Sequence, residues 1–372
     1  MKLTTSKMNV VNITIMITLF CTYIFPSGLI DYSIPIDKTI FTLVTIILFF
    51  LFNKKFTVKE ILFILLVIVL TVASKSINYL LFLPILFLKI IINEKEQIRY
   101  FLKKSNILYI CLGFSLLYSI ISFGHNGRYA YTAIMEINQS GLAIFCLGLL
   151  LMIKSKTIGN LTLIFGLLTV SRSYYLAIIL YLLSKTKIGK KISSNKFLNK
   201  NSSYFIVTFI STVILILLGL YFVEQYKLGN IFWGDEVSTR LFNFLDYSNL
   251  FRFIANLAIV TIFYLYPKKL FLGISDLEYI AYGKQVYANY GVVYKYTTPH
   301  NLFFSHLKIY GFFALIEIIY VSSILKKVVN KDNLFVFYAI MLYSIFLGAG
   351  LYSYWLYLSV FVLIILQKVE YE

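Results

Sequence analysis

The sequence predicts an all-helical protein that crosses a membrane many times. Of its 372 residues, 60% are hydrophobic and only 13% are charged, and the mean hydropathy is +0.83. Soluble globular chains carry about 25% charged residues, so this chain lacks the polar residues needed to cover a water-soluble surface. The composition excludes a soluble enzyme, a disordered chain and a disulfide scaffold. The formal net charge of +18 does not require nucleic acid as a partner, because membrane proteins gather Lys and Arg in their cytoplasmic loops.

The spans follow from the apolar runs, since a helix needs about 20 apolar residues to cross the hydrocarbon core. The first run is followed by Pro26 without a small-residue cleavage pattern, so we expect a first span rather than a removed signal peptide. The single-span candidates are 10–30, 39–52, 60–73, 77–92, 107–123, 139–153, 204–222 and 302–324. Two further runs, 160–184 and 334–366, are too long for one span and short for two.

Lysine clusters assign the sides and resolve the two long runs. The clusters expected in the cytoplasm are Asn53–Lys59, Glu94–Lys104, Lys154–Lys156, Lys185–Lys200 and Lys326–Lys331. Because clusters flank both ends of 160–184, this run should fold back at Ser171-Arg172-Ser173. A single helix would leave Arg172 near the bilayer centre, at a cost of at least about 2.5–3.5 kcal/mol. By the same logic 334–366 should fold back at Gly348-Ala349-Gly350, since glycines tolerate tight reversals.

The segment Phe253–Tyr266 is ambiguous. It is an apolar stretch between Arg252 and Pro267, and it would form either a thirteenth span or a helix lying on the membrane. The lysine distribution does not decide, but the short length favours a membrane-lying helix. On that reading we predict about twelve transmembrane helices in one membrane domain, residues 1–372, with both termini in the cytoplasm. One large external loop, about 224–301, then carries the membrane-lying helix.

Arginine is distributed differently from lysine. Most of the 29 lysines fall on the cytoplasmic side, as does Arg99, whereas the other four arginines fall outside: Arg128, Arg172, Arg240 and Arg252. A signal for topology alone would not separate the two cations. A guanidinium group grips phosphate in two places and stays charged. The pattern therefore favours a phosphate or pyrophosphate ligand at the outer face, and the alternative is four unrelated surface arginines.

Among the histidines, His300 is the leading candidate for a functional role. It lies in Thr298-Pro299-His300-Asn301-Leu302, where the polar loop enters an apolar run. An imidazole there can face substrate at the water–lipid boundary and titrate near neutrality. His306 is a second candidate on the same run. Glu317 is an acid inside an expected span, which indicates function by default, but snorkelling to the cytoplasmic end is the alternative.

No metal or other cofactor is expected. The chain contains no Asp-x-Asp sequence, and Cys21, Cys111 and Cys146 lie in apolar runs without the spacing of metal ligands. We expect these three cysteines to be small buried hydrophobes.

Four short motifs surround the long loop in a fixed order. They are Gly127-Arg128 with Asn138 and Gly141; Thr169-Val170-Ser171-Arg172-Ser173; Asp246-Tyr247-Ser248 with Arg252, Pro267 and Leu272-Gly273; and Pro299-His300-Asn301-Leu302-Phe303 with Leu307 and Gly311-Phe312-Phe313-Ala314-Leu315. On these motifs, over about residues 120–325, the chain resembles the O-antigen ligase/polymerase superfamily. Its members are membrane glycosyltransferases that use polyprenyl-diphosphate-linked glycans.

The resemblance implies a metal-independent, inverting transfer of a glycan from a lipid diphosphate to an acceptor hydroxyl. It places this reaction at the outer face of the bacterial cytoplasmic membrane. Arg172 and Arg252 would clamp the diphosphate, and His300 would orient or deprotonate the acceptor or assist the diphosphate. Arg128, Arg240 and Asn301 would be further substrate contacts.

The implied partners are the polyprenyl-diphosphate-linked oligosaccharide, membrane lipids, and a chain-length regulator and a flippase of the same pathway. The compact size and irregular loop favour a repeat-unit polymerase for capsule, O-antigen or exopolysaccharide, and an O-antigen ligase of the same superfamily stays open. A lipid-linked oligosaccharide flippase is the alternative from another class. Transporters usually show evenly long spans in repeated halves, whereas this sequence has one dominant loop and no evident repeat.

Overall fold

The computed structural model is all-helical where it describes the chain, which is at residues 5–25, 36–52, 57–74, 77–126, 129–132, 137–194, 202–232, 244–294, 299, 301–347 and 353–367. Within these ranges no strand forms, and the extended pairing is one bridge between Phe232 and Asp246. The predicted fold class is therefore confirmed at the level of an all-helical protein.

The described helices are α1 (Thr5–Leu19), α2 (Ile36–Phe52), α3 (Val58–Ser74), α4 (Leu83–Ile91), α5 (Lys95–Lys104), α6 (Ile107–Asn126), α7 (Ile137–Leu151), α8 (Lys156–Gly166), α9 (Arg172–Lys185), α10 (Lys187–Ser193), α11 (Ser202–Lys227), α13 (Tyr247–Leu265), α14 (Lys269–Leu272), α15 (Asp276–Asn289), α16 (Leu302–Tyr310), α17 (Phe313–Val328), α18 (Leu334–Leu347) and α19 (Ser353–Leu366). Short non-α turns extend some of them at Phe20–Ile24, Ile77–Phe82, Ile92–Glu94 and Leu167–Thr169.

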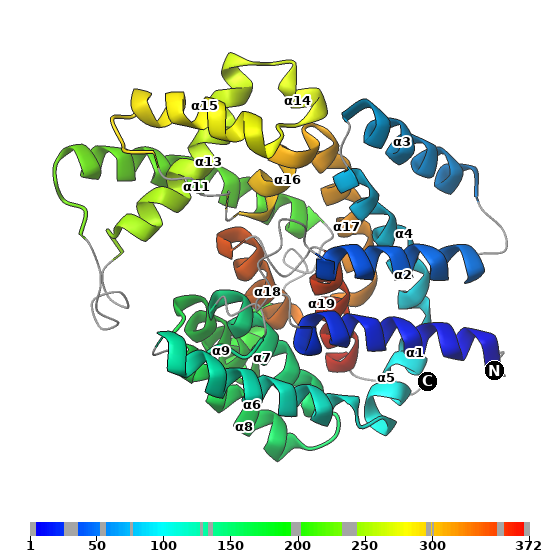
Figure 1. The fold of residues 1–372 in the computed structure, drawn as a ribbon. Helices are drawn as coiled ribbons and strands as arrows, with labels where there is room; N and C mark the ends of the chain where they lie inside the picture. The colour runs from blue at the N-terminus through cyan, green and yellow to red at the C-terminus, as the bar shows by residue number, and fades with distance from the viewer. Residues whose placement is uncertain are drawn as a thin grey trace.

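Helix α19 forms the centre of the core. Every residue from Ser353 to Ile364 is buried, as expected for a helix that is apolar on all sides. In Figure 1 the red helices α18 and α19 lie between the blue α1–α4 and the green α6–α9, with α11 and α13–α16 above. Segments distant in sequence therefore pack around one apolar helix.

Fewer helices could cross a membrane by length than the twelve predicted. Among the described residues, two are long and apolar enough, Ile206–Lys227 and Tyr247–Leu265. A third would be Leu83–Lys104 joined to Ile107–Phe123, a pair bent by 62°. The shorter apolar helices are Asn9–Ile24, Glu60–Val72, Gln139–Leu151, Leu334–Ile345 and Ser353–Leu366. The difference arises because several predicted spans are short or broken helices in the fold.

The run 160–184 folds back where the lysine clusters predicted. Helix α8 ends in a short turn at Thr169, and α9 begins at Arg172. The two helices run in opposite directions along α7. Leu163 of α8 packs where a Cβ at Gly148 of α7 would stand. The hydroxyl of Tyr181, on α9, donates to Met152 Sδ just after the end of α7 at 3.3 Å. The lysine-flanked ends of α7 and α9 therefore lie on the same side of the protein.

The run 302–324, predicted as one span, is two helices with a sharp break. Helix α16 ends at Tyr310 and α17 begins at Phe313. Gly311 has a φ of +55°, a conformation that glycine adopts far more readily than other residues. The backbone N–H groups of Ile274 and Phe312 donate to the carbonyls of Lys308 and Leu270 at 2.6 Å each. The segment before α15 therefore fixes the break in place. The run 334–366 is also divided, between Leu347 and Ser353, and its expected glycine tip lies outside the described residues.

Helix α13 is longer than the apolar stretch Phe253–Tyr266 that predicted it. Asp246 caps its start by accepting a hydrogen bond from Asn249 N at 2.7 Å, which extends the helix to Tyr247. It lies antiparallel to α11, because Tyr247 contacts Tyr226 and a Cβ at Gly219 would meet Leu257. The apolar window of α11 is only 22% buried, against 67% for α13. With 19 residues, α13 is long enough to cross a membrane, so its length does not argue against a crossing.

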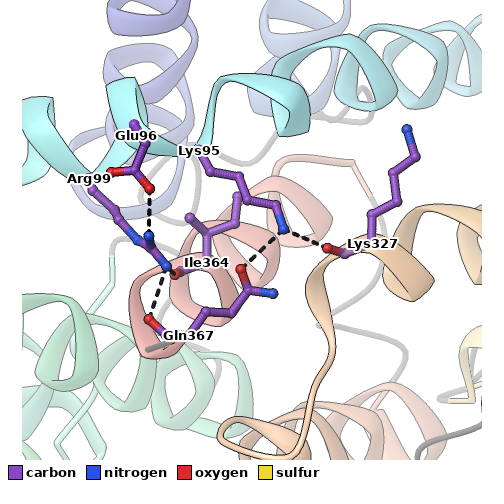
Figure 2. A network of polar contacts seen from close by, with 6 residues as sticks. All are labelled: Lys95, Glu96, Arg99, Lys327, Ile364 and Gln367. Atoms are coloured by element: carbon purple, nitrogen blue, oxygen red, sulfur yellow. Dashed lines mark hydrogen bonds and ion pairs between the residues drawn. The ribbon is translucent and has the colours of Figure 1, made fainter. Parts of the chain in front are cut away.

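The lysine-rich segment Glu94–Lys104 includes an amphipathic helix, α5, that holds the ends of two core helices (Figure 2). Arg99 donates to the carbonyls of Ile364 at 2.8 Å and Gln367 at 2.9 Å, at the end of α19. Lys95 donates to the Lys327 carbonyl at 2.7 Å, near the end of α17. Cations at helix C-termini satisfy orphan carbonyls and oppose the negative end of the dipole. The network ties α17 and α19 together at this end.

Candidate functional site

Arg172 stands at a strained turn between α8 and α9. The residue two positions before it, Val170, has a φ of +48°, which is rare for a β-branched residue and is typical of sites where surrounding structure enforces strain. The Ser171 side chain is buried but makes no capping hydrogen bond to α9. Arg172 is the first residue of α9, and its side chain is 37% exposed.

Asp246 joins Arg172 to the start of α13. Arg172 Nη2 lies 3.1 Å from Asp246 Oδ2. The same carboxylate caps α13 through Asn249 N at 2.7 Å and accepts from Asn249 Nδ2 at 3.3 Å. Arg252 lies on α13, six residues beyond the cap, which is about 9 Å along the axis. The helix that bears Arg252 therefore begins at the acidic residue that pairs with Arg172.

Asn301 fixes the start of α16 near the same region. Its side-chain oxygen caps α16 at Phe304 N at 3.0 Å, and its Nδ2 donates to the Ile345 carbonyl of α18 at 2.7 Å. Helices α18 and α9 pack together. A Cβ at Gly141 would lie 3.0 Å from Tyr343 Oη and 3.5 Å from Tyr174 Cβ, so the end of α18 is level with the start of α9. The starts of α9, α13 and α16 thus gather around the end of α18.

The electrostatics of this region favour an anion. A helix start carries about half a positive charge and commonly binds phosphate, although the caps from Asp246 and Asn301 already take up one N–H group each at α13 and α16. Arg172 and Arg252 add two full positive charges, and Asp246 removes one. A diphosphate is the kind of ligand that such a surplus of positive charge suits, because guanidinium groups bind phosphate oxygens in pairs.

The structure describes three of the six predicted site residues. Arg172 and Arg252 lie in the same region, and Asn301 is buried with both ends of its amide bonded to the protein. These bonds hold α16 against α18, and the substrate contact expected of Asn301 stays a prediction. His300, Arg128 and Arg240 lie outside the described residues. His300 immediately precedes the α16 cap.

A buried acid–histidine pair lies on the helices that follow. His306 Nδ1 on α16 contacts Glu317 Oε2 on α17, and both side chains are more than nine-tenths buried. They line a small pocket together with Asn301 and Ser344. Each residue was a weak candidate from its position in the sequence, but their pairing requires the break at Gly311. Glu317 therefore does not snorkel, because a partner inside the protein satisfies it.

No group of three or more His, Cys, Asp or Glu side chains gathers within the described ranges. Cys21, Cys111 and Cys146 are all buried and free, as the sequence predicted.

Comparison with known proteins returned no relative. No family model, no curated protein and no solved structure matches the chain.

Proposed function

We propose that the chain is a polytopic protein of the bacterial cytoplasmic membrane that crosses it about twelve times, with the arginine site facing outward. What supports this is an outer surface rich in exposed large apolar side chains, which follow α2, α3, α6 and α11. Patches of this extent mark contact with lipid or a partner. The short and broken helices count as crossings where neighbouring helices enclose them, because irregular backbone is tolerated at membrane depth only inside protein.

The proposed activity is that of a polysaccharide repeat-unit polymerase, a metal-independent inverting glycosyltransferase acting on polyprenyl-diphosphate-linked oligosaccharides. The observation that carries it is Arg172, held by Asp246 at the start of the helix that bears Arg252. The charges are fixed before substrate arrives. Preorganised donors of this kind stabilise charge that develops in a transition state.

The chemistry follows from the leaving group. As the bond from the anomeric carbon to the phosphate oxygen breaks, negative charge builds on the diphosphate. Arg172 and Arg252 stabilise this charge together with the helix starts. His300, next to the α16 cap, orients or deprotonates the acceptor hydroxyl or assists the diphosphate. Arg128 and Arg240 provide further contacts to the donor.

Two other functions would use the same region. An O-antigen ligase would transfer a finished glycan to a different acceptor, and a flippase would move the lipid-linked oligosaccharide without making a bond. A chain-length regulator and a flippase of the same pathway would be partners of the polymerase.

The test uses the lipid-linked oligosaccharide fraction extracted from a strain that lacks the protein. Purified wild-type protein in lipid nanodiscs is expected to convert it into lipid-linked polymer, and Arg172→Ala and Arg252→Ala should not. Single repeat units accumulating beside a normal ligation product would favour the ligase. Oligosaccharide that stays on the cytoplasmic face of the deletion strain would favour the flippase and refute the polymerase.

A further inference from the structure

Helices α7 to α10 place six lysines on one face of the protein. Helices α8 and α9 both pack on α7, and α10 packs on α9, so the end of α7, the start of α8, the end of α9 and α10 meet. The charges of Lys156 and Lys190 both act on the ammonium group of Lys185. We call this surface the lysine face, and its members are Lys154, Lys156, Lys185, Lys187, Lys190 and Lys191.

Acidic side chains do not offset the positive charge of the lysine face within the described part of the chain. The sequence has no Asp or Glu from residue 137 to residue 223, and the ion pairs among described residues include none of the six lysines. Lys154 and Lys185 instead lie over aromatic rings, with Nζ 5.0 Å from the ring centroid of Tyr109 and 4.7 Å from that of Tyr181. A concentration of one sign of charge attracts ligands of the opposite sign, so this face suits an anion.

Helix α10 gives the lysine face an apolar edge. Gly189 lets α10 pack closely on the end of α9, because a Cβ at this position would overlap the Leu183 carbonyl oxygen. Ile188 and Ile192 lie one turn apart on α10 and are 67% and 39% exposed. Exposed apolar side chains beside lysines on one helix are typical of a helix that lies in the membrane interface.

Large apolar side chains are also exposed farther along α8 and α9. They include Leu161 and Ile164 of α8 and Ile179 and Leu182 of α9. A phospholipid has the same arrangement, since a charged headgroup is attached to apolar chains. Inorganic phosphate or an acidic peptide would complement the lysines but would leave these apolar side chains uncovered. The surface therefore fits a lipid better than a soluble anion.

We propose that the lysine face binds the headgroups of anionic phospholipids in the cytoplasmic leaflet, with Ile188 and Ile192 of α10 entering the acyl region. The face lies at the opposite end of α9 from Arg172, about 20 Å away along the helix axis. The lipid site is therefore separate from the arginine site, and it does not depend on the proposed glycosyl transfer. One lysine near an anionic membrane surface raises the affinity about fivefold, so six should select anionic over zwitterionic lipids.

The experiment titrates defined lipids into the purified full chain in a non-ionic detergent and measures bound lipid by native mass spectrometry. Phosphatidylglycerol is the anionic probe, and phosphatidylcholine with the same acyl chains is the zwitterionic control. Wild type should bind phosphatidylglycerol at least tenfold more tightly than phosphatidylcholine. The variant K156Q/K185Q/K190Q should lose about 10- to 100-fold in affinity for phosphatidylglycerol, as expected for the removal of three such lysines.

Two further variants separate the lysine face from net charge and from soluble anions. K227Q/K268Q/K284Q removes the same charge from three exposed lysines outside the face and should bind phosphatidylglycerol within about twofold of wild type. I188S/I192S keeps every charge but removes apolar contacts with the lipid, so it should bind phosphatidylglycerol about tenfold more weakly. All these side chains are exposed, so the melting temperatures should stay close to that of wild type. If K156Q/K185Q/K190Q does not fold, K187Q/K191Q repeats the comparison on α10 alone.

Several results would overturn the lipid site. Wild type binding the two lipids equally, or both triple lysine variants losing affinity equally, would show that the lysine face selects no lipid. Displacement of phosphatidylglycerol by inorganic phosphate or by polyglutamate, with I188S/I192S binding like wild type, would assign the face to a soluble anion or an acidic protein segment instead. A protein that prefers phosphatidylglycerol but makes no polymer would refute the proposed function and leave this site standing, and polymer formation without the lipid preference would do the reverse.

Discussion

Two arginines at different places in the fold should separate catalysis from stability. Arg172 Nη2 lies 3.1 Å from Asp246 Oδ2 and its side chain is 37% exposed, so this ion pair contributes at most about 1 kcal/mol. Removing it does not strand Asp246, which keeps its two bonds to Asn249. Arg172→Ala should therefore unfold almost like wild type. Its polymerisation rate should fall by about 10²–10³-fold, which is the loss seen when one transition-state donor is removed, or about 2.7–4 kcal/mol.

Arg99 is the matched control. It is 14% exposed and bonds two carbonyls at the end of α19 as well as Glu96. Hydrogen bonds to charged groups contribute about 1.5–3 kcal/mol, so Arg99→Ala should destabilise the fold by about 2–3 kcal/mol and leave the rate per folded molecule unchanged. Thermal unfolding in detergent and the nanodisc polymerisation assay measure the two quantities. A rate for Arg172→Ala within threefold of wild type, or equal loss of rate in both variants, would refute the reasoning.

Three further predictions concern the scaffold. Gly311→Ala should destabilise the fold by about 3 kcal/mol or more, because φ is +55° and the new Cβ would lie 2.2 Å from the Leu270 carbonyl oxygen. The control Gly113→Ala, where a Cβ meets open space, should stabilise the fold slightly. Equal melting temperatures for the two variants would contradict this. Asp246→Ala should cost about 1 kcal/mol more than Asp246→Asn, since asparagine also caps a helix, as thermal unfolding can measure. Burial opposes ionisation of Glu278, but hydrogen bonds from Lys269 and Ser275 and the Lys269 charge outweigh it and lower the pKa below 4.5. The stability that this carboxylate gives α15 is therefore present above pH 4.5 and lost as the pH falls through the lowered pKa. Hydrogen exchange in α15 should accordingly rise in acid. A Glu278→Gln variant with the same rise in acid would count against this.

Part of this architecture could be predicted from the sequence because charge placement constrains it strongly. The reversal before α9 followed from lysine clusters on both sides of 160–184 and from the cost of burying Arg172. The interruption between α18 and α19 followed from run length and glycines. Both inferences rest on strong local effects, which are the cost of burying one arginine in the membrane and the tolerance of glycines for a tight reversal.

Other features depend on tertiary contacts that no local pattern encodes. The break at Gly311 is set by backbone hydrogen bonds from residues about forty positions earlier, and one glycine in an apolar run does not predict it. Unless that break is known, the spacing of His306 and Glu317 in the sequence does not predict that their side chains meet. The α13 cap was readable in principle, since Asp246 precedes the helix, but its contact with Arg172 spans 74 positions. Whether the short helices cross the membrane stays a prediction.

Accessibility of positions 172, 252 and 300 tests the central proposal most directly. Single variants Arg172→Cys, Arg252→Cys and His300→Cys are expressed in whole cells and treated with a membrane-impermeant thiol reagent; the three native cysteines are buried and should react little. The proposal predicts that all three introduced thiols react from outside and that added lipid-linked oligosaccharide protects them. Reaction of any one of them only from the cytoplasmic side would contradict a single outward-facing diphosphate site.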